Sequence, residues 1–225
     1  MISILYEDNH LLIVQKPVNI PVQEDSSKDP DLLSLLKEDL KKRYDKPGNV
    51  YLGLVHRLDR PVGGVMVFAK TSKAASRLAE QVRTHQIKKI YHAIIQGRVA
   101  QRDSWDDYLI KDEKKNRVSV TSAQNSKAKK ATLHYHTIAK KEDLSLVEIQ
   151  LETGRPHQIR VQFSSRNAPL WGDQRYNLNA TVGQQIALWA VQLELQHPIT
   201  KEKLTFTSQP PNQYPWSLLK GETYA

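Results

Sequence analysis

The chain has 225 residues and no cysteine, and its 33 lysines and arginines outnumber 24 acidic residues, which gives a net charge of +9. The lack of cysteine excludes disulfides, thiolate metal sites and cysteine nucleophiles. The excess of positive charge favours a polyanionic partner such as a nucleic acid. A membrane surface would instead require a basic amphipathic helix with exposed aromatic residues, and the sequence shows none.

The N-terminal segment, residues 1–16, contains only short apolar runs, which are interrupted by Glu7, Asp8 and His10. It therefore fits neither a signal peptide nor a membrane span, and we expect a cytoplasmic protein. Two strands are predicted, at residues 2–6 and 11–16, with a hairpin turn between them.

A helix is predicted to follow from Asp29, because an aspartate cap precedes Pro30, and proline is favoured at the first helical position. Its end is predicted near Gly48. Its apolar stripe would consist of Leu33, Leu36, Leu40 and Tyr44.

The next informative stretch is an apolar strand at residues 64–69, preceded by the charged sequence His56-Arg57-Leu58-Asp59-Arg60. Pro61, Gly63 and Gly64 make the charged residues a bend that leads into a buried strand. The neighbouring arginines favour an ionised Asp59. Taken alone, this pattern is compatible with a structural ion pair as well as with a catalytic carboxylate.

A helix at 72–84 and a buried strand at 88–96 follow, with Tyr91 near the polar start of the strand. Between residues 97 and 130, strands are predicted only at 107–110 and 117–120. Seven lysines or arginines lie between Lys111 and Lys130. Such a run is typical of a flexible solvated loop, and in an RNA enzyme it could also grip phosphates.

Two paired strands are predicted at 131–140 and 144–151, and two more at 186–195 and 203–207. His134 and His136 have the spacing of metal ligands, but no third ligand stands near them in sequence, so we interpret them as exposed strand residues. We expect no metal site.

A second polar motif runs from residue 151 to 160 and reads Leu-Glu-Thr-Gly-Arg-Pro-His-Gln-Ile-Arg. Gly154 lets the chain leave the strand, and Pro156 suits the first turn of a helix predicted to extend to Arg166. His157 and Arg160 would share one face near the start of that helix, where backbone amides favour phosphate. Solvent-exposed basic residues at a helix start are the simpler alternative.

Four segments together resemble the RluA-like family of RNA pseudouridine synthases, which act on ribosomal and transfer RNA. They are the His-Arg-Leu-Asp motif with its glycine pair, the Lys-Ile-Tyr-His-Ala strand, the Thr-Gly-Arg-x-His-Gln-Ile-Arg motif with Trp171-Gly172-Asp173, and Ala187-Leu-Trp-Ala with His197-Pro198. The N-terminal segment that ends in Lys16-Pro17 also resembles the start of the family's catalytic domain. The chain departs from the family pattern at Val62 and Gly63, Pro156, Trp189 and residues 167–169.

The resemblance implies an α+β fold: one catalytic domain over residues 1–225, with a mainly antiparallel mixed sheet, flanking helices and a central RNA-binding cleft, and no separate N-terminal RNA-binding domain. It implies that Asp59 is the catalytic carboxylate. Arg155 would pair with Asp59, and Tyr91 would stack on the base or move a proton. The residues expected to bind RNA are Arg57, His56, Arg60, Lys88, His157 and Arg160, with Arg57 filling the space left by a flipped base.

The predicted function is therefore isomerisation of specific uridines to pseudouridine in structured RNA, with ribosomal RNA favoured over transfer RNA. The reaction needs no cofactor, and we expect a monomer. The alternative is a non-catalytic basic RNA-binding or ribosome-associated module. A glycosidase-like hydrolase is less favoured, because such enzymes generally need two carboxylates and only Glu152 lies near the second motif.

Overall fold

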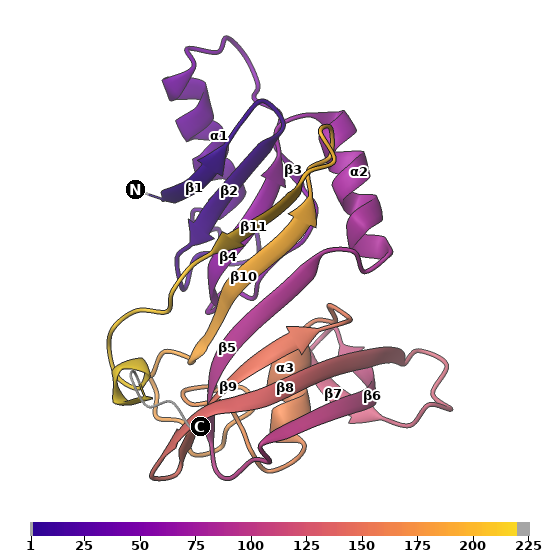
Figure 1. Ribbon diagram of the computed structural model, residues 1–225, viewed down its shortest axis with the longest axis vertical. Coiled ribbons are helices and arrows are strands. Elements are labelled where there is room, and N and C mark those ends of the chain that lie inside the picture. The colour runs from indigo at the N-terminus through magenta and orange to yellow at the C-terminus, as the bar shows by residue number, and fades with distance from the viewer. Residues whose placement is uncertain (1, 220–225) are drawn as a thin grey trace. The chain divides into compact units, whose positions relative to one another are not determined.

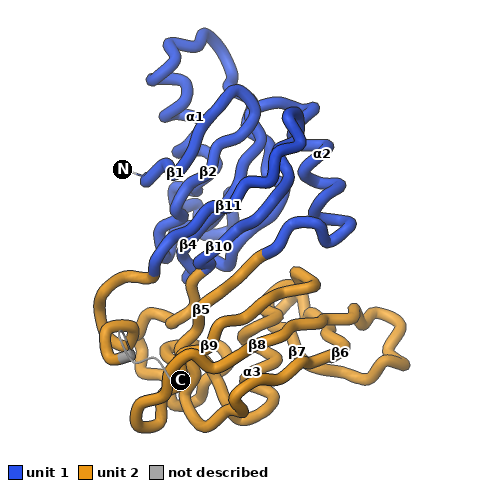
Figure 2. Tube along the Cα trace, in the orientation of Figure 1, with its two compact units in different colours: residues 1–88, 190–209 blue, residues 89–189, 210–225 orange. Residues whose placement is uncertain are grey.

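The computed structural model describes residues 2–219, which belong to two compact units (Figure 2). Unit 1 comprises residues 1–88 and 190–209, and unit 2 comprises residues 89–189 and 210–225. The chain thus leaves unit 1 and returns to it late in the sequence. The expectation of a single domain over residues 1–225 stays a prediction.

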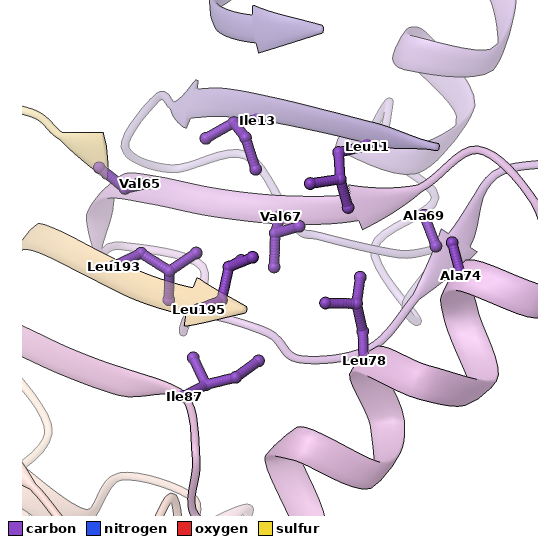
Figure 3. Packing of buried hydrophobic residues seen from close by; sticks show 10 residues of the cluster. All are labelled: Leu11, Ile13, Val65, Val67, Ala69, Ala74, Leu78, Ile87, Leu193 and Leu195. Carbon is purple, nitrogen blue, oxygen red and sulfur yellow. The ribbon is translucent and has the colours of Figure 1, made fainter. Parts of the chain in front are cut away.

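Unit 1 contains strands in the order β1-β2-β4-β10-β11, with the short strand β3 also paired to β4 (Figure 1). The pairs β1–β2, β2–β4, β3–β4 and β10–β11 are antiparallel, whereas β4 and β10 run in the same direction (Figure 3). The predicted strands at 2–6, 11–16 and 64–69 are confirmed, whereas β3 was not predicted. The elements are β1 (Ser3–Glu7), β2 (Leu11–Lys16), α1 (Leu32–Arg43), β3 (Gly53–Leu54), β4 (Gly63–Ala69), α2 (Ser72–Arg83), β10 (Leu188–Gln196, whose first two residues lie in unit 2) and β11 (Lys203–Thr207).

The core of unit 1 lies between this sheet and α2 (Figure 3). Every residue of β4 is buried, because both faces of the strand are covered. Leu78 of α2 is fully buried against the sheet, and burying a leucine in this way contributes about 2 kcal/mol. The core residues are Leu11, Ile13, Val65, Val67, Ala69, Ala74, Leu78, Ile87, Leu193 and Leu195.

Helix α1 begins later than the sequence predicts. Its N-cap is Asp31, whose carboxylate accepts a hydrogen bond from the Ser34 amide at 3.0 Å. The predicted cap, Asp29, instead accepts a hydrogen bond from the Arg60 guanidinium. In place of a stripe that starts at Leu33 and includes Tyr44, the buried residues of the helix are Leu32, Leu36 and Leu40.

Unit 2 contains antiparallel strands in the order β5-β9-β8-β6-β7, with α3 packed on them. Phe163 of α3 places its ring 4.6 Å from that of Trp105 and 5.2 Å from that of Tyr135, which fixes the helix on the sheet. The elements are β5 (Lys88–Gln96, whose first residue lies in unit 1), β6 (Arg102–Asp112), β7 (Arg117–Thr121), β8 (Lys129–Lys141), β9 (Leu144–Leu151), α3 (Gln158–Ser164) and the 3-10 helix η1 (Trp216–Leu219).

The basic region between Lys111 and Lys130 is more ordered than the predicted solvated loop. Strands β6 and β7 form a hairpin, and β6 also pairs with β8. Val118 is buried in a cluster with Leu109 and Val161. Sequence reasoning underestimated these strands because most of their exposed residues are charged or polar, and only a few apolar residues, such as Trp105, Leu109 and Val118, are buried.

Candidate active site

The predicted site residues divide between the two units. Asp59 lies in unit 1, in the segment that joins β3 to β4, and is half-buried. The amide of Val62 donates to the Asp59 carbonyl at 2.9 Å, so residues 59–62 form a tight turn immediately before the buried strand β4. Asp59 is thereby attached to the most buried strand of the unit.

Gly64, at the start of β4, is required for the close packing of β4 against β10. Its φ is +120°, and a Cβ at this position would lie 2.2 Å from the Ala190 carbonyl oxygen of β10. Only glycine therefore allows β10 to approach β4 this closely.

Lys16, the last residue of β2, holds the turn from inside the protein. Its side chain is fully buried, and its ammonium donates to the carbonyls of Pro17, Arg60 and Val62 at 2.9, 2.9 and 2.8 Å. Burial lowers the pKa of Lys16 to about 7, and the nearby charge of Asp59 opposes that shift. Sequence reasoning missed this role, because a lysine before a proline suggests only the end of a strand.

Arg60 was predicted to bind RNA, and the structure gives it local partners. Its Nε donates to the Asn19 carbonyl at 3.2 Å, and its Nη1 donates to the Ser27 hydroxyl at 2.9 Å. It also pairs with Asp29, and this hydrogen bond lowers the pKa of the Asp29 carboxyl. Arg60 therefore links the loop between β2 and α1 to the turn that contains Asp59.

The two other basic residues of the first motif differ from each other. His56 accepts a hydrogen bond from the Val67 amide at its Nε2, at 3.1 Å, so that nitrogen carries no proton and the ring braces β4. Arg57 is exposed and makes no hydrogen bond or ion pair with the part of the chain that the structure describes. Among the motif's basic residues, Arg57 is thus the one whose donors are not used within residues 2–219.

Tyr91 and Arg155 lie in unit 2. Tyr91 is buried in β5, opposite Ile149 of β9. Arg155 is half-buried, and its Nε donates to the Lys130 carbonyl at 2.8 Å, which orients the guanidinium. The predicted pairing of Arg155 with Asp59 would join residues of the two units and stays a prediction.

Gln158 organises the turn that carries Arg155, a role that the sequence did not indicate. Its Oε1 accepts from the Arg155 amide at 3.0 Å and from the Thr153 hydroxyl at 2.8 Å. Its Nε2 donates to the Thr132 carbonyl of β8 at 3.0 Å. Because Gln158 is buried, these bonds fix the turn to the sheet.

Helix α3 begins at Gln158, so Pro156 does not lie in its first turn as predicted. His157 precedes the helix with a φ of +52°, a left-handed conformation that interrupts helical geometry. Its Nδ1 lies 2.8 Å from the Tyr176 hydroxyl, which also accepts from the Val118 amide. Strain at a histidine of this turn is the kind of feature that functional sites retain.

Arg160 was also predicted to bind RNA, but the structure buries it. Its Nε and Nη2 donate to the two carboxylate oxygens of Asp173 at 2.8 and 2.7 Å. Its guanidinium lies 5.2 Å from the centre of the Tyr176 ring. This buried bidentate ion pair gives Arg160 a structural role in holding α3 against the Trp171-Gly172-Asp173 segment.

The remaining predicted RNA contact, Lys88, is exposed, and its Nζ lies 3.5 Å from a Glu194 carboxylate oxygen. The described residues contain no group of three side chains suited to hold a metal ion. His134 instead contacts Ser104 and Glu152, each at 2.7 Å. No helix among residues 2–219 is long and apolar enough to span a bilayer.

Comparisons with known proteins identify the family of this chain and its fold. Residues 10–165 match the family model described as RNA pseudouridylate synthase. Ribosomal large subunit pseudouridine synthase D of Zymomonas mobilis is 33% identical over 221 residues, which cover 93% of this chain and 69% of the relative. tRNA pseudouridine synthase C of Yersinia pestis is 32% identical over 229 residues, which cover 93% and 86%. The solved structure of human RNA pseudouridylate synthase domain containing 4 has a TM-score of 0.78 and 26% identity, covering 93% of this chain and 88% of that one.

The fold and the family match together define an RNA pseudouridine synthase, an intramolecular isomerase. Within that class, the chain belongs to the RluA-like family. The predicted family, enzyme class and α+β fold are confirmed, and the non-catalytic module and the hydrolase are no longer needed as alternatives.

Replacing Lys16 by methionine leaves the carbonyls of Pro17, Arg60 and Val62 without a buried donor. We expect the free energy of unfolding to fall by about 2 kcal/mol, because a buried acceptor without a partner costs roughly 1–3 kcal/mol. We also expect slower turnover, because the turn that carries Asp59 loosens. Guanidinium unfolding and a pseudouridine assay measure the two effects.

The pH dependence of stability provides the control. In the wild type, the folded-state pKa of Lys16 is about 7, and its ordinary value is 10.5. Between these values the unfolded chain binds more protons, so this group makes stability rise with pH, and below about pH 7 that gain is absent. In Lys16→Met, the free energy of unfolding should not show this rise with pH. An equal dependence on pH in both proteins would contradict the argument.

Replacing Arg160 by methionine leaves the buried Asp173 carboxylate without its cation. We expect a loss of about 3–5 kcal/mol in the free energy of unfolding. The double variant with Asp173→Asn should lose less than the sum of the single variants, by more than about 1 kcal/mol, since the two side chains interact directly. Additive losses in denaturant titrations would argue against the pair.

Proposed function

We propose that this enzyme converts specific uridines to pseudouridine in structured RNA with Asp59 as the catalytic carboxylate. The observation that carries this assignment is the fixed position of Asp59, half-buried in a turn that Lys16 holds and that leads into the buried strand β4. The reaction breaks the bond between ribose C1′ and uracil N1 and forms one from C1′ to C5. The proton displaced from C5 leaves, and N1 gains one, so no oxidant or reductant is consumed.

Asp59 would either attack the ribose or abstract a ribose proton. In both cases it must be ionised and aimed at the sugar, and an arginine partner favours both. Arg155 is suited to this role, because its Nε is anchored to the Lys130 carbonyl while its two Nη groups make no bond with the described residues. Tyr91 would stack on the base or move a proton late in the reaction.

A uridine inside folded RNA must leave its stack before it reaches a half-buried carboxylate. Arg57 lies two residues from Asp59 and is exposed, so it can fill the space that the base vacates. His157 and Lys88 would contribute to the RNA surface, whereas His56, Arg60 and Arg160 support the catalytic turn and α3.

Ribosomal RNA is the favoured substrate. Relatives from Zymomonas mobilis, Pseudomonas aeruginosa and Nitrosomonas europaea, 33%, 31% and 34% identical, are named ribosomal large subunit synthases. Those from Yersinia pestis and Pectobacterium carotovorum, 32% and 29% identical, are named tRNA synthases, so transfer RNA is the second candidate. The expectations of a cytoplasmic monomer without a metal or other cofactor stay predictions.

Tritium release from RNA labelled at uridine C5 tests the reaction and the carboxylate together. We expect release by the wild type and a loss of at least about 1,000-fold in Asp59→Asn, because the variant keeps the shape of the side chain without its charge. Ribosomal and transfer RNA from a strain lacking this protein, assayed separately, identify the substrate. Equal release by both proteins would remove Asp59 from the mechanism.

Arg57→Ala and Arg155→Ala should lose different steps. We expect Arg57→Ala to slow turnover of structured RNA by about 10- to 100-fold but to spare a short single-stranded substrate, which needs little unstacking. Arg155→Ala should slow both substrates equally, because it affects the chemical step. The two variants are compared by their single-turnover rates on the structured and the single-stranded substrate. Equal losses by both variants on both substrates would contradict the division of roles.

A further inference from the structure

Lys89 is a half-buried lysine, and it lies beside the residues of unit 2 that we assign to catalysis. It stands two residues before Tyr91 on β5, so the two side chains leave the same face of the strand. Its partner across the ladder is Leu151, the last residue of β9, after which the chain turns toward Arg155. A Cβ at Gly154 would lie 3.4 Å from Lys89 Nζ, so the amine rests against this turn.

The amine has no compensating partner among the described residues. Lys89 makes no hydrogen bond or ion pair there, and burial, which lowers its pKa, is the sole cause of that shift. The neighbouring Lys88 differs, since it points to the opposite face, is exposed and lies near Glu194. A desolvated cation without an anion costs free energy, which a negatively charged ligand would offset.

We propose that Lys89 binds a phosphodiester group of the substrate RNA, next to the uridine that Tyr91 contacts. This inference rests on the proposed function. The phosphodiester is the negatively charged group of RNA, and a lysine binds it through a charge-assisted hydrogen bond. Gly154 supports the assignment, because its missing side chain leaves the amine accessible beside the turn. A neutral uracil oxygen is the competing ligand.

The test measures RNA affinity against salt concentration in the Asp59→Asn background, in which turnover does not alter the RNA. We expect Lys89→Met to bind about tenfold more weakly at low salt. Its plot of log affinity against log salt should be shallower by about 0.7, because one fewer counterion is released. Lys89→Arg keeps the charge and should keep the slope. Lys73→Met, which removes an exposed lysine of α2, should change neither quantity.

Two outcomes overturn the inference. If Lys89→Met keeps the wild-type salt slope but slows tritium release, Lys89 contacts an uncharged group. If its affinity falls only together with its thermal stability, and Lys89→Arg does not restore binding, the lysine is structural. A third outcome separates the two proposals. If the wild type releases no tritium but Lys89→Met still gives a shallower salt dependence of RNA affinity, the proposed isomerisation is refuted while the phosphate contact stands.

Discussion

Lys16 ends strand β2 with its ammonium fully buried, and the carbonyls that it binds belong to segments more than 40 residues apart in sequence. An ammonium has three hydrogens, and each finds an acceptor. Two of the acceptors belong to Arg60 and Val62, which lie in the turn that begins at Asp59. The position of Asp59 therefore depends on a buried cation.

Buried polar groups repeat this arrangement in unit 2. Gln158 fixes the turn before Arg155, and Arg160 joins α3 to Asp173. Each makes several bonds in a low-dielectric setting, where such networks gain in strength and in which an unpaired member would be costly. The turn that carries Arg155 is thus fixed to the sheet, which limits the entropy that ordering it would cost.

Basic residues of the two motifs look alike in sequence but fall into two groups in the structure. Arg60 and Arg160 donate to groups of the protein itself, whereas Arg57 is exposed without a partner among residues 2–219. The excess positive charge of the chain is therefore a poor guide to which cations meet RNA. Asp29 illustrates the same limit, because Arg60 takes the carboxylate that local rules assign to a helix cap.

The sequence by itself determined the family, the buried strand after Asp59, most strands and the identity of the motifs, because these follow from local spacing and alternation. Tertiary structure alone decided that Lys16 and Arg160 are buried and which groups they bind. The burial of a charge and the partner that compensates it depend on residues distant in the chain, so neither can be inferred from the neighbours of a lysine or arginine in sequence.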